Sequence, residues 1–211
     1  MKSDFDHFLW GVPDLDKGIA LFTERTGVQP AIGGRHPGIG TRNALASLGP
    51  GIYFEIIAPD PAQPLAETLG GDIAVLPHPT LMTMALRAPD LSTVAAIYDA
   101  HNIPVDQSDE GRETPEGKML SWSLCEPQHQ IRPMDPRWPF YIDWKNTPHP
   151  SGTTPSGCTF TSVAFGGPNA AATQKLWQDL GISVPFEEAD RHRVALDINT
   201  PKGVVTFEGV F

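Results

Sequence analysis

Residues 33–43 gather an unusual number of groups that can hold a ligand. They comprise four glycines, a proline, an imidazole, two guanidinium groups and an amide, in the order Gly33-Gly34-Arg35-His36-Pro37-Gly38-Ile39-Gly40-Thr41-Arg42-Asn43. This Gly and Pro content disfavours a helix or a central strand, and predicts a loop whose backbone can approach a ligand closely. Arg35, Arg42 and Asn43, with His36 beside them, are suited to clamping a carboxylate or a polarised carbonyl group. The alternative is a bulged hairpin whose charges are merely solvated.

One carboxylate, Glu55, lies within the strongly apolar stretch Tyr53-Phe54-Glu55-Ile56-Ile57. A carboxyl group that points into the protein from such a strand has a raised pKa unless it meets a cation. Glu55 is therefore the best candidate in the chain for a general base or a metal ligand. Trp10 and Trp122 are candidates for the apolar walls of a ligand pocket, and packing in the core is the alternative for both.

A strand and a helix are predicted before the glycine-rich stretch, and further strands after it. Residues 5–12 are expected to form the first strand. Asp14 is expected to cap a helix that carries an apolar stripe and ends at Gly27. Extended segments follow at 28–32, at 43–48 and at 52–58, with turns between them. The glycine-rich stretch therefore connects strands, as a binding loop would.

The same order of elements returns twice, which indicates an internal repeat. Residues 83–91 align with residues 7–15, and residues 162–169 align with the same opening. Towards the end of each repeat, Ser123 aligns with Glu55 in the second copy and Glu208 aligns with it in the third. One strand–helix–strands unit leaves a face of its sheet bare, so the units must pair to bury it.

The composition excludes some classes of partner. The chain has 211 residues, with 25 acidic and 15 basic ones, and a formal net charge of −10. Without a basic patch, nucleic acid and membrane surfaces are poor candidates as partners. Cys125 and Cys158 form no CxxC spacing, so a thiolate metal site is not expected. The chain shows no apolar leader or membrane-spanning run, and a cytoplasmic location is expected.

The opening Asp6-His7-Phe8-Leu9-Trp10-Gly11-Val12-Pro13-Asp14-Leu15 resembles the first strand and helix entry of the vicinal oxygen chelate superfamily, which includes glyoxalase I and extradiol dioxygenases. Residues 33–43 and 122–144 resemble its glyoxalase-like branch. The resemblance covers essentially the whole chain. It implies an α+β fold in which repeated βαβββ units form an open half-barrel of mixed sheet, with helices outside. The units are expected at about 1–62, 80–145 and 155–211, with 128–157 partly a crossover segment.

The resemblance also implies a divalent metal, Mn, Fe, Ni or Zn, held by the first and last strands of paired units. The first unit offers His7 and Glu55. The second offers only the poor ligands Thr83 and Ser123. If the first unit pairs with the third, Glu208 completes a set with His7 and Glu55; if it pairs with the second, His36 is the candidate third ligand. The alternatives are a hydrogen-bonded histidine at position 7 and a solvated Glu208.

Two functions follow from the resemblance and the residues. The first is a lyase, isomerase or dioxygenase that acts on a small molecule with adjacent oxygens. In this enzyme a bound metal would act as the Lewis acid on those oxygens, and Glu55 would act as the base. The second is a metal-free protein that binds an organic acid or toxin through Arg35, His36, Arg42 and Asn43, with Trp10 as a wall. Because the units pair and three is an odd number, the third unit must either pack on the same barrel or pair with its copy in a second chain. The second arrangement is a homodimer, which is the expected partner of the chain.

Overall fold

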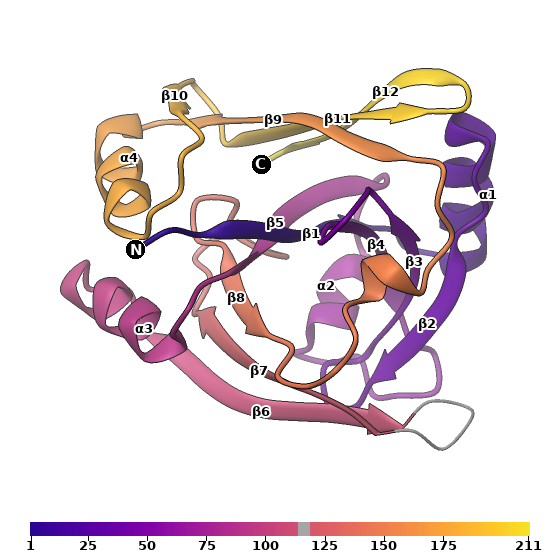
Figure 1. Ribbon diagram of the computed structural model, residues 1–211, viewed down its shortest axis with the longest axis horizontal. Coiled ribbons are helices and arrows are strands. Elements are labelled where there is room, and N and C mark those ends of the chain that lie inside the picture. The colour runs from indigo at the N-terminus through magenta and orange to yellow at the C-terminus, as the bar shows by residue number, and fades with distance from the viewer. Residues whose placement is uncertain (114–118) are drawn as a thin grey trace.

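The computed structural model describes residues 1–113 and 119–211. Within these residues the chain forms an eight-stranded sheet, a separate four-stranded sheet, four α-helices and a short 3-10 helix. The large sheet curls into a half-barrel with the helices of residues 15–26, 91–100 and 170–179 outside it (Figure 1), which confirms the predicted fold class.

The first unit has the predicted order of elements: β1 (Asp4–Gly11), α1 (Leu15–Thr26), β2 (Ala31–His36), β3 (Thr41–Ser47) and β4 (Tyr53–Pro59). Asp14 caps α1 by accepting a hydrogen bond from the Lys17 amide, and Gly27 ends the helix at φ 79°. The stretch 33–43 is a hairpin formed by β2 and β3, with a bulge between Ile32 and Arg35. The hairpin alternative is therefore correct for the backbone.

The second unit comprises β5 (Thr80–Arg87), α3 (Leu91–Ala100), β6 (Val105–Glu113), β7 (Met119–Pro127) and β8 (Phe140–Asp143). The short helix α2 (Leu69–Ala74) connects the two units. Strands β1 and β5 pair antiparallel and join the units into one sheet, ordered β2-β3-β4-β1-β5-β8-β7-β6. The first unit therefore pairs with the second.

The last strand of the second unit differs from the prediction. Strand β8, which lies within the expected crossover segment, pairs parallel with β5 just as β4 pairs parallel with β1. In these pairs Phe140 lies opposite Ala85, and Glu55 lies opposite Leu9. Phe140, and not Ser123, therefore occupies the position equivalent to Glu55.

The third segment comprises β9 (Thr159–Gly167), α4 (Ala170–Asp179), β10 (Phe186–Glu188), β11 (Arg193–Thr200) and β12 (Gly203–Val210), after the 3-10 helix η1 (Pro150–Gly152). Its strands are ordered β10-β9-β11-β12, which is not the order of the first unit. Asn169 precedes α4 but makes no side-chain cap; the Glu188 carboxylate accepts from the first amides instead. This segment packs against the large sheet of the same chain (Figure 1).

Alternation along the strands separates two apolar layers. Phe8, Trp10 and Phe54 point to the convex face of the half-barrel, where they pack with residues of α1 and the small sheet such as Phe22 and Phe207. The neighbouring residues on β1 and β4 point to the concave face. That face carries a smaller apolar cluster made of Leu9, Ile57, Ile73, Met82, Ala85, Leu124, Met134, Phe140 and Ile142.

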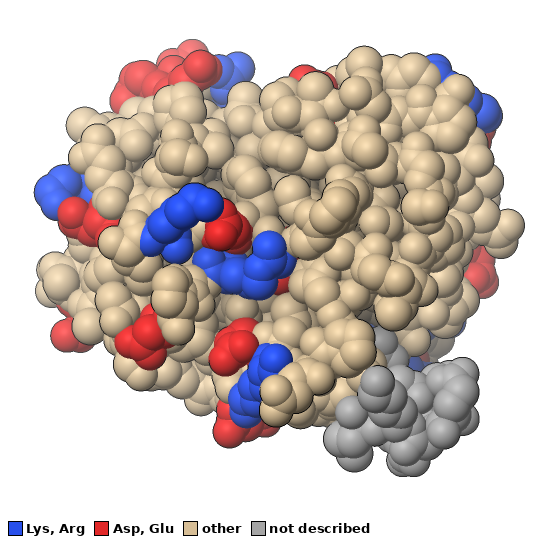
Figure 2. All heavy atoms as spheres, in the orientation of Figure 1, with Lys and Arg blue, Asp and Glu red and all other residues tan. Residues whose placement is uncertain are grey.

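Among the described residues, no helix is long and apolar enough to cross a membrane. On the face shown in Figure 2, lysine and arginine side chains lie among acidic ones and form no continuous basic patch, in line with the net negative charge.

Candidate functional site

A cavity of about 700 Å³ occupies the concave face of the half-barrel. Both edge strands, β2 and β6, contribute to its walls and curve towards each other in Figure 1. Its lining is mainly apolar and aromatic, with a few polar side chains that come from β1 to β4 on one side and from β6 and β7 on the other. A concave, mostly apolar cavity with a few convergent polar groups is the usual form of a small-molecule site. The residues that carry the chemistry there include His7, Asn43 and Glu55.

His7 lies between two carboxylates. Its Nδ1 is 2.7 Å from Asp6 Oδ1, and its Nε2 is 3.3 Å from Glu55 Oε2. The ring stacks on Tyr53 with centroids 4.4 Å apart. Asp6 is fully buried, and His7 and Glu55 are 3% and 5% exposed. The row Asp6–His7–Glu55 is therefore shielded from bulk water, and Glu55 reaches the cavity wall.

The charges of this row stabilise one another. Burial opposes the charged form of each group, yet the hydrogen bonds and charges of Asp6 and Glu55 raise the pKa of His7 to about 9. Burial likewise opposes ionisation of Glu55, but His7, His36 and Asn43 hold its pKa below the usual range. At neutral pH the row consists of an imidazolium between two carboxylates.

The raised pKa of His7 predicts a pH-dependent stability. An imidazole with pKa about 9 in the folded state and about 6.5 in the unfolded state stabilises the fold fully below pH 6.5. That contribution is lost as the pH rises from about 6.5 to 9, and its upper limit is about 3 kcal/mol. Urea unfolding at these pH values should show the loss in wild type and in His78→Gln, whose imidazole is exposed, but not in His7→Gln. An equal slope in His7→Gln would contradict the assignment.

Asn43 orients Glu55 and is itself held by the hairpin bulge. The Gly34 amide donates to Asn43 Oδ1 at 2.7 Å, which turns the Asn43 Nδ2 towards Glu55 Oε1, also at 2.7 Å. The His36 Nε2 lies 3.4 Å from the Asn43 Nδ2, and the His36 Nδ1 lies 2.8 Å from the Thr41 Oγ1. Asn43 therefore uses its side chain within the protein and is not a free clamp for a ligand.

The bulge requires glycine at position 33. A Cβ added at Gly33 would lie 2.1 Å from Asn43 Oδ1. Gly33→Ala should therefore displace Asn43 from Glu55 and lower the free energy of unfolding by about 1–3 kcal/mol. Gly152→Ala is the matched control, because a Cβ there meets nothing within 4 Å. Chemical denaturation compares the two; equal stability would show that Asn43 is not held as described.

The other predicted ligand-binding residues are placed differently. Arg35 lines the cavity but is bound through two nitrogens to Asp60, at 2.7 and 2.8 Å. Arg42 and Trp10 do not line the cavity. Trp10 was expected as a pocket wall; this is wrong, because strand alternation turns it to the convex face, where it packs on Phe54 and Phe207.

Neither predicted metal set, His7 and Glu55 with Glu208 or with His36, is assembled among the described residues. Glu208 is exposed on β12 of the small sheet, whereas His7 and Glu55 line the cavity of the large one. The equivalent positions of the second unit carry Thr83, whose buried hydroxyl has no hydrogen-bond partner among the described residues, and the apolar Phe140. Within residues 1–113 and 119–211 no group of three or more His, Cys, Asp or Glu could hold a metal. This donor set does not fit a resident divalent ion.

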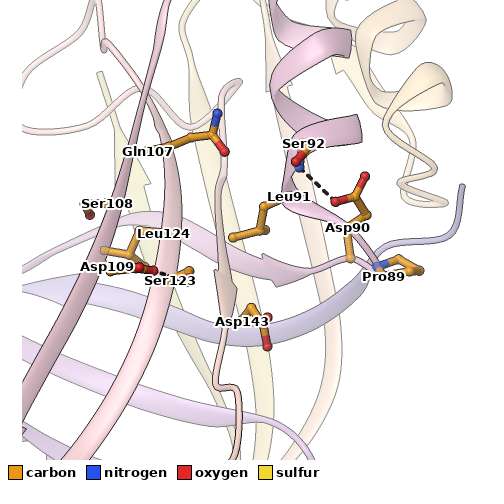
Figure 3. Close-up of a pocket in the computed structure, with 11 residues that line it drawn as sticks. Pro89, Asp90, Leu91, Ser92, Gln107, Ser108, Asp109, Ser123, Leu124 and Asp143 are labelled. Carbon is orange, nitrogen blue, oxygen red and sulfur yellow. Dashed lines mark hydrogen bonds between the residues drawn. The ribbon is translucent and has the colours of Figure 1, made fainter.

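Ser123 lies in a different hollow. This second cavity, of about 430 Å³, lies between the start of α3 and strands β6 to β8 (Figure 3). There Ser123 Oγ donates to Asp109 Oδ1 at 2.6 Å, and Asp90 caps α3 through the amides of Ser92 and Thr93. Ser123, Asp109 and Asp90 are therefore already paired, and the chemistry is assigned to the larger cavity, which holds His7 and Glu55.

Sequence reasoning missed Asp6, which is the centre of the buried network. Besides His7, it accepts hydrogen bonds from Arg87 Nη1 at 2.7 Å and Trp144 Nε1 at 3.1 Å, and it lies 3.0 Å from His149 Nε2. The register of β1 against β5 shifts between Phe5 and His7, and this irregularity is not visible in the sequence. The adjacent Asp6-His7 pair was the one available signal.

Comparison with known proteins identifies relatives of the chain. A family profile described as a glyoxalase-like domain matches residues 5–181. No curated protein matches the chain. A hypothetical protein from Staphylococcus aureus superposes with a TM-score of 0.65 and 18% identity, over 99% of this chain and 86% of that one. A mutant 4-hydroxymandelate synthase from Streptomyces coelicolor gives 0.52 and 11%, over 99% of this chain and 62% of that one. These identities show a shared fold alone.

Proposed function

The chain belongs to the glyoxalase-like domain family, and from that premise we propose that it is a small-molecule enzyme that moves a proton next to a carbonyl group of its substrate. The proposal rests on one observation: the Glu55 carboxylate and the His7 imidazolium lie side by side, 3.3 Å apart, at the wall of the concave cavity. Glu55, which can accept a proton, and His7, which can donate a hydrogen bond to an oxygen, therefore lie together.

The two groups divide the reaction between them. Glu55 accepts the proton from the carbon next to the carbonyl, the C–H bond breaks, and its electron pair moves onto the carbonyl oxygen. As Glu55 takes up the proton and loses its charge, the His7 Nε2–H, which faces Glu55 Oε2 before the reaction, donates its hydrogen bond to the developing oxyanion instead. Asp6 keeps the imidazole oriented and charged through Nδ1. Return of the proton to another position gives an isomerase, whereas loss of a neighbouring group gives a lyase. Each step uses groups that the chain itself supplies.

Deuterium exchange tests this proposal without knowledge of the natural substrate. Compounds with a carbonyl group next to a C–H bond (α-hydroxyketones, α-keto acids and thioesters) are incubated with the protein in D₂O and followed by proton NMR. We expect at least one compound that binds to exchange faster with protein than in buffer. If every compound that binds exchanges at the buffer rate, proton transfer is refuted.

Binding without catalysis is the second candidate, and one observation favours it. Both oxygens of Glu55 already face donors, Asn43 at 2.7 Å and His7 at 3.3 Å, which weakens the carboxylate as a base. A protein that sequesters a small molecule needs the cavity but no base. The exchange experiment separates the two functions, because a sequestering protein protects its ligand's protons or leaves them unchanged.

A further inference from the structure

The cations that line the cavity are already balanced, whereas two of its carboxylates are not. His7 is flanked by Asp6 and Glu55, and Arg35 is bound to Asp60. On the opposite wall, Glu110 and Glu126 line the cavity from β6 and β7 without an ion pair or hydrogen bond to any described residue. A ligand that enters the cavity therefore meets uncompensated negative charge on one side.

The strand register places Glu126 in line with His7. His7 lies opposite Ala85, and Ala85 lies opposite Phe140. Cys125 lies opposite Tyr141 in the antiparallel pair of β7 and β8, so Glu126 is next to Phe140. Three strand spacings separate β1 from β7, about 14 Å along the sheet. The apolar Phe140, which contacts the His7 ring edge-on at 5.5 Å, lies between the two polar ends.

The surroundings of Glu126 suit a cation. Trp122 and Trp144 line the same wall, with ring centroids 5.6 Å apart, and aromatic faces attract ammonium groups. Burial, Glu110 and Asp106 raise the pKa of Glu126 to about 7. Glu126 is therefore only partly ionised at neutral pH in the free protein, and a positively charged group on a ligand would stabilise its carboxylate form against both the burial and the repulsion.

We infer that Glu126 determines the substrate class of the cavity: an elongated molecule with an apolar middle, a carbonyl group at the His7–Glu55 end and a protonated amino group at the Glu126 end. The inference rests on the proposed function for the carbonyl end only. At the amino end, the ammonium donates to the Glu126 carboxylate, and the apolar part of the ligand next to it lies against Phe140 on the neighbouring strand. Anionic ligands of the same size are disfavoured by Glu110 and Glu126.

Two probes of matched size and opposite charge test this inference. Isothermal titration compares 4-phenylbutylammonium with 4-phenylbutyrate on the wild-type protein. We expect the ammonium to bind at least tenfold more tightly, and Glu126→Gln to weaken it about tenfold, the effect of one charge-assisted hydrogen bond. Glu208→Gln removes an exposed carboxylate on the small sheet and should leave the affinity unchanged. The indole N–H signal of Trp122 should move on binding in wild type.

The inference is overturned if the carboxylate binds as tightly as the ammonium, if the ammonium does not bind at millimolar concentration, or if Glu126→Gln retains the wild-type affinity. The comparison of the two probes on wild type needs no variant to fold. Glu55→Gln separates this inference from the proposed function. Loss of deuterium exchange with retained ammonium affinity supports both, whereas exchange by wild type without preference for the ammonium refutes the amino end alone.

Discussion

Replacing Glu55 with glutamine is expected to slow deuterium exchange next to a carbonyl group by about 10²–10⁴-fold, the range for loss of a positioned general base. Glutamine keeps the size of the side chain and can still contact Asn43 and His7, so the cavity should persist. What is lost is the oxygen that accepts the proton and the charge that stabilises the His7 imidazolium. The measurement is the exchange rate by proton NMR on any compound that wild type exchanges.

Glu208→Gln is the matched control for this substitution. It makes the same chemical change on an exposed position of the small sheet and should retain the wild-type rate. Circular dichroism and thermal unfolding confirm that both variants are folded. Full activity of Glu55→Gln would show that another group takes the proton.

Replacing Asp6 with asparagine is expected to destabilise the protein by about 3–5 kcal/mol, because it removes one partner of a buried charge network. Asp6 is fully buried, and its carboxylate accepts hydrogen bonds of 3.1 Å or less from the side chains of His7, Arg87 and Trp144. Asparagine leaves the Arg87 guanidinium and the His7 imidazolium without their shared counter-ion. Urea unfolding at pH 7 measures the loss.

The pH dependence of the same network has a defined sign. His149 and His7 hold the pKa of Asp6 well below its usual value, although burial alone would raise it. Its contribution is therefore present above the unfolded pKa of about 3.8 and is lost as the pH falls towards the folded pKa. Asp6→Asn should lack this acid-dependent loss, whereas Asp4→Asn, at an exposed position, should change stability by less than about 1 kcal/mol. Matching acid profiles for wild type and Asp6→Asn would refute the role of Asp6.

The sequence predicted the parts of the fold that depend on local signals. Asp14 and Gly27 marked the ends of α1, and the repeated strand–helix openings marked the starts of three units without showing which of them pair. Strand β8 was missed because it has only four residues, within a segment rich in proline and tryptophan where no period can be recognised. The alignment of the repeats was therefore wrong by one strand, and it made Ser123, instead of Phe140, equivalent to Glu55 of the first unit.

The site was predicted in part. His7 and Glu55 share a cavity face because β1 and β4 are parallel neighbours with matching alternation. That same alternation turns Trp10 away, which the sequence could have shown. Two other features depend on segments that are distant in sequence, so no local pattern predicts them. They are the ion pair of Arg35 with Asp60 and the position of Glu126 on the opposite wall of the cavity.

The most direct test of the account is an NMR titration of the His7 imidazole between pH 5 and 10, with His7→Gln to assign its signals. If His7 is a cation held between Asp6 and Glu55, its pKa is near 9 in the wild type and falls in Glu55→Gln. A pKa at or below about 6.5 would show a neutral imidazole beside Glu55. The oxyanion donor on which the proposed reaction depends would then be absent.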